Sequence, residues 1–179
     1  LLGKDTKDID VAVRADAHLL GRGLADRLGG HFVSLDETFD TTRVVVLAEG
    51  RRYSVDLASF DSSIDADLAR RDFTVDAMAV SLGDALSGQW KLMDPHGGRV
   101  DAQNRTIRAV GSDVFRADPA RMMRAVRLAA SLKFSLDSDT AALIRRDAGM
   151  VLSVSPERVR EELLQRLAEE GARDSVRLL

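Results

Sequence analysis

The 179-residue chain is predicted to have an α+β fold: a small mixed sheet with its helices, then an all-helical segment beyond a boundary near Gly111. Two observations favour this fold. Runs rich in valine, tyrosine and phenylalanine, which are typical of strands, come before residue 111. After it, apolar residues recur at helical spacing. We therefore expect two parts, residues 1–111 and residues 112–179.

Each element of the first part is predicted from its local pattern. In residues 8–13 polar and apolar side chains alternate, so Ile9, Val11 and Val13 are expected to form the core face of a strand. Leucines at helical spacing predict a helix over 16–28 that ends at Gly29-Gly30. Further strands are expected over 32–35, 43–47, 52–58 and 90–93, with a short apolar element over 78–82 and a helix that leads from Ser62 into 67–71.

Beyond Gly111 the predicted elements are helices, over 113–131, 138–147 and 155–170, and no further strand is expected. Ser155-Pro156-Glu157 is typical of a helix start, with a capping hydroxyl, a proline at the first helical position and an acid in the first turn. Trp90 is expected in the core.

Composition excludes several classes of function. The absence of cysteine excludes disulfides and thiolate metal sites, and is compatible with a reducing, cytoplasmic location. No apolar run approaches membrane-spanning length, so no membrane partner is expected. The net charge of −3 argues against indiscriminate nucleic-acid binding but is compatible with a local basic face. Because the chain opens on Leu1 and stops within a helical pattern, we expect it to be a piece of a longer protein.

Three aspartates are candidate metal ligands. Asp8 and Asp10 are one residue apart, so in a strand both project from the same face, close enough to hold a hard cation such as Mg²⁺. Asp56, on the polar face of the strand over 52–58, would join them if the two strands are neighbours in the sheet. The alternatives are a solvated strand face or a turn cap for the pair, and a surface aspartate for Asp56.

Residues 70–79, RRDFTVDAMA, form a second candidate site. The adjacent arginines offer planar donor forks suited to phosphate or carboxylate. A helix end with arginines near its carbonyls, balanced by Asp72, explains the charges equally well. That interpretation does not account for the other residues of the string.

The third candidate site is the run of residues 115–127, FRADPARMMRAVR. Asp118-Pro119 is typical of a helix start, so a purely structural Asp118 is one interpretation. Arg121, Arg124 and Arg127 recur every third residue and form a basic stripe on this helix. The basic face that the net charge does not reveal is concentrated here.

These strings, in this order, resemble the class II branch of the tRNA nucleotidyltransferase and bacterial poly(A) polymerase family, within the polymerase-β-like nucleotidyltransferase superfamily. The resemblance also extends to residues 94–98, DPHGG, and to Ser155-Pro156-Glu157-Arg158. It implies a nucleotidyltransferase head over 1–111 and a helical neck over 112–179 that recognises the nucleotide base.

The resemblance implies a role for each candidate residue. Asp8, Asp10 and Asp56 correspond to the family's catalytic carboxylates, which bind two Mg²⁺ ions that activate the RNA 3′-hydroxyl and stabilise the departing pyrophosphate. The other matching residues imply contacts with the incoming ATP or CTP: Arg71 and Asp72 at its sugar and phosphates, Asp118 and Arg121 as a template for its base, and Arg124 and Arg127 nearby.

The template role has an independent physical basis. Adenine and cytosine both present an amino donor beside a ring-nitrogen acceptor, and an aspartate acceptor beside an arginine donor complements both. Guanine and uracil present a carbonyl and an N–H at these positions, so each contact becomes a mismatch. Asp118 and Arg121, three residues apart on one helix, could make such a pair.

The chain departs from the family pattern at four places. The glycine turn that holds the triphosphate is expected upstream of Asp8, where Gly3 stands alone. Asp76 replaces the usual asparagine, and Ala117 replaces the usual glutamate before Asp118. Phe60 runs directly into Asp61-Ser62-Ser63, where the family carries an arginine and a flexible loop, so we expect residues to be missing there.

The function predicted from the resemblance is template-independent addition of C and A residues to the 3′ end of tRNA, a cytoplasmic reaction that uses ATP, CTP and Mg²⁺. Addition of A alone and poly(A) synthesis on another RNA 3′ end share the same motifs. The alternative from a different class is a catalytically silent RNA-binding module. The sequence does not indicate the oligomeric state.

Overall fold

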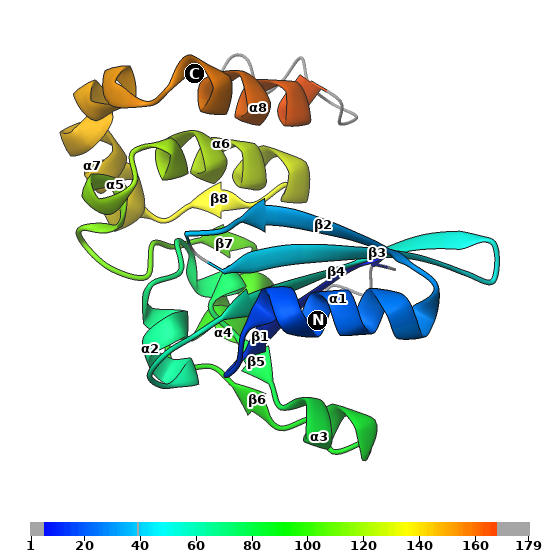
Figure 1. The fold of residues 1–179 in the computed structure, drawn as a ribbon. Coiled ribbons are helices and arrows are strands. Elements are labelled where there is room, and N and C mark those ends of the chain that lie inside the picture. Colours follow the sequence, from blue (N-terminus) through cyan, green and yellow to red (C-terminus); the bar gives the residue numbers. More distant parts are fainter. Residues whose placement is uncertain (1–5, 39, 168–179) are drawn as a thin grey trace. The chain divides into compact units, whose positions relative to one another are not determined.

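The computed structural model describes residues 6–38 and 40–167 (Figure 1). Backbone contacts divide the chain into two compact units that meet at Asp67 and Leu68, and each unit is described by itself. Gly3 and residues 168–170 of the last predicted helix lie outside the described residues. The functional division into 1–111 and 112–179 stays a prediction.

The first unit contains a mixed four-stranded sheet, as the sequence predicts. Its strands lie in the order β1-β4-β3-β2, with β1 parallel to β4 and the other neighbours antiparallel. The elements are β1 (Asp8–Val13), α1 (Ala17–Leu28), β2 (His31–Asp36), β3 (Thr41–Ala48), β4 (Arg51–Ser59) and α2 (Ile64–Ala69), which crosses the boundary between the two units.

Helix α1 packs along this sheet and buries its small side chains (Figure 1). Ala17, Ala25, Val44 and Leu57 form the buried core there. Val11 and Val13 pack against that core, but the side chain of Ile9 is 47% exposed, so its predicted core position is wrong. The first three residues of β1 are all exposed, and packing against the core begins only at Val11.

The second unit is mostly helical. Its core is formed by Phe73, Ile107, Phe115, Met122 and Ala125. The elements are η1 (Thr74–Asp76), β5 (Ala79–Val80), α3 (Leu82–Leu86), β6 (Leu92–Met93), α4 (Gly98–Gln103), β7 (Thr106–Ile107), α5 (Val114–Ala117), α6 (Ala120–Leu132), β8 (Ser135–Leu136), α7 (Ser138–Asp147), η2 (Ala148–Ser153) and α8 (Pro156–Leu167).

Two predictions about this unit are wrong in detail. A two-residue strand, β8, pairs in parallel with β7, although no strand was expected beyond Gly111. It forms because Lys133 ends α6 in the left-handed conformation (φ 57°) and the next residues return to bond the backbone of Arg105 and Ile107. The helix expected over 113–131 is interrupted at Asp118-Pro119, between α5 and α6.

Trp90 is a third correction, because its side chain is 72% exposed rather than part of the core. It follows the turn at Gly88 (φ 75°) that leads out of α3, whose Leu82 and Leu86 are also exposed. Among the described residues, no helix is both long and apolar enough to cross a membrane.

Candidate functional site

The three predicted carboxylates lie on one face of the first unit's sheet. Strands β1 and β4 are parallel neighbours, and their register places Asp10 opposite Asp56. Asp8 precedes Asp10 by two residues, so it projects from the same face. Asp8 and Asp10 are exposed, and Asp56 is partly buried. Exposed carboxylate oxygens on one face are donors that suit a hard cation such as Mg²⁺.

An arginine that the sequence did not single out lies beside these carboxylates. Arg43 of β3 stands opposite Asp56, and its Nε and one terminal nitrogen each donate to an Asp56 oxygen at 2.7 Å. The pKa of the Arg43 guanidinium is raised, mainly by these hydrogen bonds and also by the negative charges of Asp56, Asp8 and Asp10. This residue therefore belongs to the same electrostatic cluster.

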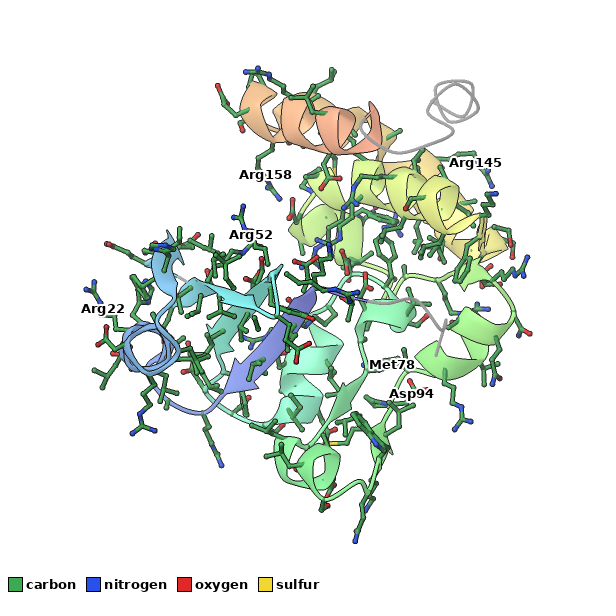
Figure 2. The ribbon with its side chains drawn as sticks, turned by 90° about the vertical axis from the view of Figure 1, so that its right-hand side faces the viewer. Arg22, Arg52, Met78, Asp94, Arg145 and Arg158 are labelled. Atoms are coloured by element: carbon green, nitrogen blue, oxygen red, sulfur yellow. The ribbon has the colours of Figure 1, made fainter. Side chains whose placement is uncertain are left out.

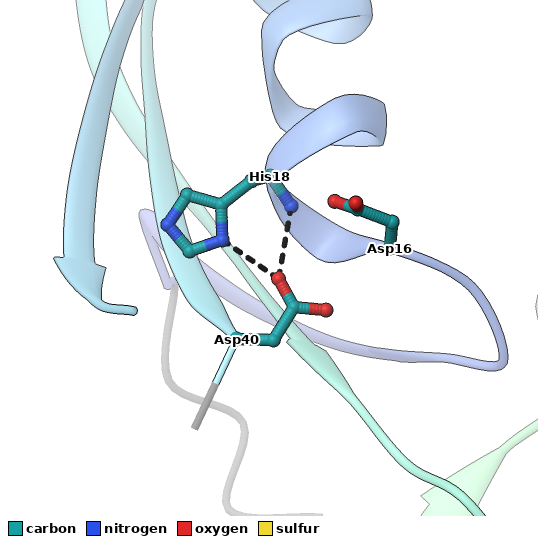
Figure 3. Close-up of side chains that lie close together, drawn as sticks. All are labelled: Asp16, His18 and Asp40. Carbon is teal, nitrogen blue, oxygen red and sulfur yellow. Dashed lines mark hydrogen bonds and ion pairs between the residues drawn. The ribbon is translucent and has the colours of Figure 1, made fainter. Parts of the chain in front are cut away.

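A different group in this unit has the spacing of metal ligands. One ligand atom from each of Asp16, His18 and Asp40 lies within 4.8 Å of the others (Figure 3). Asp40 accepts hydrogen bonds from the backbone N–H groups of Ala17 (2.8 Å) and His18 (3.2 Å), and its Oδ1 lies 2.7 Å from His18 Nδ1. Asp16 caps the same helix by accepting from the backbone N–H of Leu19 at 2.7 Å.

These contacts assign the group a structural role. The start of α1 already supplies donors and a positive dipole end to both carboxylates, which opposes the binding of a cation. The hydrogen bond from His18 is the main cause that lowers the pKa of Asp40 to about 2. Because this pKa is depressed, the stabilisation is complete above the ordinary carboxyl pKa and is lost as pH falls through about 2.

The second unit contains a polar pocket of about 230 Å³ that gathers most of the predicted nucleotide-binding residues. Five arginines and three acids dominate its lining, so the pocket suits an anionic ligand that also carries hydrogen-bonding groups. The lining residues are Arg70, Arg71, Asp72, Asp118, Ala120, Arg121, Arg124, Arg158 and Glu162.

Asp118 has a partner in this pocket that sequence reasoning missed. Its carboxylate lies 4.0 Å from Arg121 Nε, and it accepts two hydrogen bonds from Arg158, at 3.0 and 2.8 Å. Burial raises the pKa of Asp118, but the hydrogen bonds and charge of Arg158, together with the Ala120 backbone N–H and the charge of Arg121, lower it below its ordinary value. Arg158 projects from the start of α8 (Figure 2), where the sequence predicts a helix start but no contact with Asp118.

The other two predicted arginines of α6 have different surroundings. Arg124 lies 2.8 Å from the largely buried Asp72 and 3.8 Å from Asp76, the aspartate found where the family has asparagine. Arg127 is only 15% exposed and pairs with Glu162 of α8 at 2.7 Å. Arg127 thus links α6 to α8 and is not among the residues that line the pocket.

A network of hydrogen bonds holds Thr74, within the string of residues 70–79. Thr74 donates its hydroxyl to Asp101 of α4 at 2.7 Å, and Arg108 bridges Asp101 and Asp137 at 3.1 and 2.7 Å. Helix α4 also approaches η1 so closely that a Cβ on Gly98 would lie 2.0 Å from the carbonyl oxygen of Thr74. Gly98, the last residue of the DPHGG string, thus packs against the segment that also carries the pocket residues Arg71 and Asp72.

Two family models match the chain. Residues 1–108 match the poly(A) polymerase head domain, and residues 133–179 match a model described as the probable RNA- and SrmB-binding site of polymerase A.

Similar proteins include the CC-adding tRNA nucleotidyltransferases of Geobacter sulfurreducens (43% identical, covering 93% of this chain and 37% of that protein) and Synechocystis (38% identical, covering 90% and 38%). Among solved structures, a CCA-adding enzyme with ATP has a TM-score of 0.84 at 30% identity and covers 98% of this chain and 43% of that one. A tRNA-processing enzyme with CTP also has a TM-score of 0.84 at 30% identity, covering 99% and 48%. The chain thus spans less than half the length of each of these relatives.

Proposed function

The chain belongs to the poly(A) polymerase head-domain family of nucleotidyltransferases, and on that premise we propose that it is part of an enzyme that adds C and A residues to the 3′ end of tRNA. The observation that carries the proposal is the row of carboxylates formed by Asp8, Asp10 and Asp56 on adjacent strands. The similar CC-adding and CCA-adding proteins support the choice of tRNA, CTP and ATP as substrates. The lack of cysteine is compatible with a cytoplasmic location, which we also propose.

In this proposal Asp8 and Asp10 hold two Mg²⁺ ions, with Asp56 as the third carboxylate. When bound, these ions supply the Lewis-acid chemistry that activates the RNA 3′-hydroxyl and stabilises the departing pyrophosphate. The carboxylates contribute their charge and their common face on rigid strands, which fixes the positions of the oxygen ligands.

The pocket of the second unit is assigned to the incoming nucleotide. Arg71 and Arg124 line it and supply guanidinium donors for the triphosphate, while the buried Asp72 orients Arg124. Asp118 and Arg121 serve as acceptor and donor for the base. Arg127 supports α8 through Glu162. The two hydrogen bonds from Arg158 orient the Asp118 carboxylate, whose Oδ2 keeps acceptor capacity for the base, so Arg158 is part of the same recognition unit.

Addition of C alone is a second candidate, and the names of two similar proteins favour it. The similar proteins of Geobacter sulfurreducens and Synechocystis are both named CC-adding tRNA nucleotidyltransferases. Independently of this choice, residues 60–63 connect β4 to α2 at the place where the resemblance predicts a longer flexible loop. The backbone N–H of Phe60 bonds the Val13 carbonyl at 3.0 Å, and Arg14 donates to the Ser62 carbonyl at 2.9 Å.

The two candidates are distinguished by the products of one assay. The full-length protein is incubated with Mg²⁺, tRNA lacking its terminal residues, and labelled CTP, ATP or both. We expect CTP alone to extend the RNA by C residues, and both nucleotides together to add a further A. Extension that stops at C with both nucleotides would identify the C-adding activity. Extension by ATP alone would indicate A addition or poly(A) synthesis, and no incorporation at all would indicate the silent module.

Arg121→Ala tests the assignment of the base template. We expect it to reduce the preference for CTP and ATP over UTP and GTP by about 10²-fold, because a site that no longer pairs with the base cannot reject the wrong one. The measurement is kcat/KM for each nucleotide. Arg145→Ala, on the far helix α7 (Figure 2) and outside the pocket lining, is the control. Unchanged selectivity in the Arg121 variant would remove the template role from this residue.

A further inference from the structure

The positively charged side chain of Arg43 lies level with two candidate metal ligands, Asp56 and Asp10, on one face of the first unit's sheet. Arg43 of β3, Asp56 of β4 and Asp10 of β1 are register partners across three adjacent strands. Side chains at one level of neighbouring strands project from the same face, and the strands lie about 4.8 Å apart. Arg43 therefore stands two strands from Asp10, and the charges of Asp8 and Asp10 act on it.

Arg43 holds Asp56 in a defined orientation. Both carboxylate oxygens of Asp56 accept from the guanidinium, each at 2.7 Å, in the two-point geometry that only arginine provides. The two side chains keep 41% and 28% of their surface exposed, so the pair is a weak source of fold stability. The contact between Arg43 and Asp56 orients the carboxylate strongly but adds little to fold stability. We therefore explain it by its effect on the neighbouring carboxylates of Asp8 and Asp10.

We propose that Arg43 is a positioning residue that competes with a divalent cation for Asp56. Its fixed charge opposes a second positive charge in the row, and its fork draws both Asp56 oxygens toward β3. Arg43 thereby lowers the affinity of the carboxylate row for metal and sets the metal concentration at which the row fills. This inference rests on the proposed function, which assigns the metal to Asp8 and Asp10.

Arg43→Gln tests the competition by direct metal binding. Full-length protein is titrated with Mn²⁺, and the free ion is followed by electron paramagnetic resonance. The variant removes the charge and the fork, so we expect the dissociation constant for Mn²⁺ to fall about tenfold, as for one nearby unit charge partly screened by solvent. The Mg²⁺ concentration that gives half-maximal nucleotidyl transfer should fall in parallel.

Arg27→Gln is the matched control. Arg27 is exposed in the last turn of α1, and α1 packs with Val44 and Leu57, whose side chains project from the face of the sheet opposite to Arg43 and Asp56. We expect it to leave Mn²⁺ affinity within about twofold of wild type. Arg43→Lys keeps the charge without the fork, so its Mn²⁺ affinity should lie between those of wild type and Arg43→Gln, provided that thermal melting shows both variants folded.

The outcomes separate this inference from the proposed function. If wild type binds no Mn²⁺ and the Asp8 and Asp10 variants behave like it, the metal site itself is wrong. If wild type binds Mn²⁺ but Arg43→Gln binds it equally well or more weakly, the competition is wrong and the function stands. In an Asp56→Asn background the part of the effect that runs through the fork should disappear, so Arg43→Gln should tighten Mn²⁺ binding less than it does when Asp56 is present; an undiminished effect would show that the fork on Asp56 plays no part.

Discussion

Asp10→Asn is expected to reduce nucleotidyl transfer by about three orders of magnitude. A bound catalytic metal supplies several kcal/mol of transition-state stabilisation, and each ~1.4 kcal/mol is a factor of ten in rate. Asparagine keeps the size of the side chain but removes the charge from the middle of the carboxylate row, level with Asp56. The measurement is the single-turnover rate of labelled CMP incorporation into tRNA at saturating CTP and Mg²⁺.

Further measurements show whether the loss of rate arises at the metal site or from misfolding or weaker CTP binding. Because Asp10 is exposed on its strand, the variant should melt at nearly the wild-type temperature. CTP binding by the pocket that Arg71 and Arg124 line should also persist, since those residues belong to the other unit. Asp26→Asn removes an exposed carboxylate from α1 and should keep the full rate. Retention of more than about a tenth of the wild-type rate by Asp10→Asn would argue against a metal-holding role for Asp10.

Local patterns were enough to predict the sheet that carries this carboxylate. Valine and tyrosine content placed strands at β3 and β4, and leucines at helical spacing with a closing Gly29-Gly30 placed α1. The two-residue period of a strand placed Asp8 and Asp10 on one face. Their meeting with Asp56 depended only on whether two strands are neighbours, which a sequence can propose but not decide.

Contacts that depend on register or on distant helices could not be predicted. Nothing local to Arg43 indicates that Asp56 stands opposite it, because that pairing is set by the turn between β3 and β4. Arg158 meets Asp118 only because α8 packs on α6, 40 residues further along the chain. The exposure of Trp90 was missed because residue type predicts average burial and not the path of one turn.

Among the glycine-to-alanine substitutions in the second unit, we expect Gly98→Ala to be the most destabilising. The added methyl carbon would lie 2.0 Å from the carbonyl oxygen of Thr74 and 2.7 Å from its carbon, so the backbone of η1 or α4 has to move. Alanine favours a helix over glycine by up to about 1 kcal/mol. Overpacking against rigid backbone costs about 1–3 kcal/mol or more, and Thr74 is fixed by its bonds to Asp101 and Arg108. The steric cost should therefore exceed the gain in helix propensity, so the free energy of unfolding should fall by about 2 kcal/mol.

Urea denaturation of the full-length protein, followed by circular dichroism, measures this loss. Gly111→Ala is the matched control, because a Cβ there meets nothing within 4 Å, and its unfolding free energy should stay within about 0.5 kcal/mol of wild type. Displacement of Thr74 also shifts Asp72, which orients Arg124, so Gly98→Ala should weaken CTP binding while Gly111→Ala does not. Equal midpoints for the two variants would show that α4 can move away from η1 at little cost, and that the DPHGG string does not hold the pocket in place.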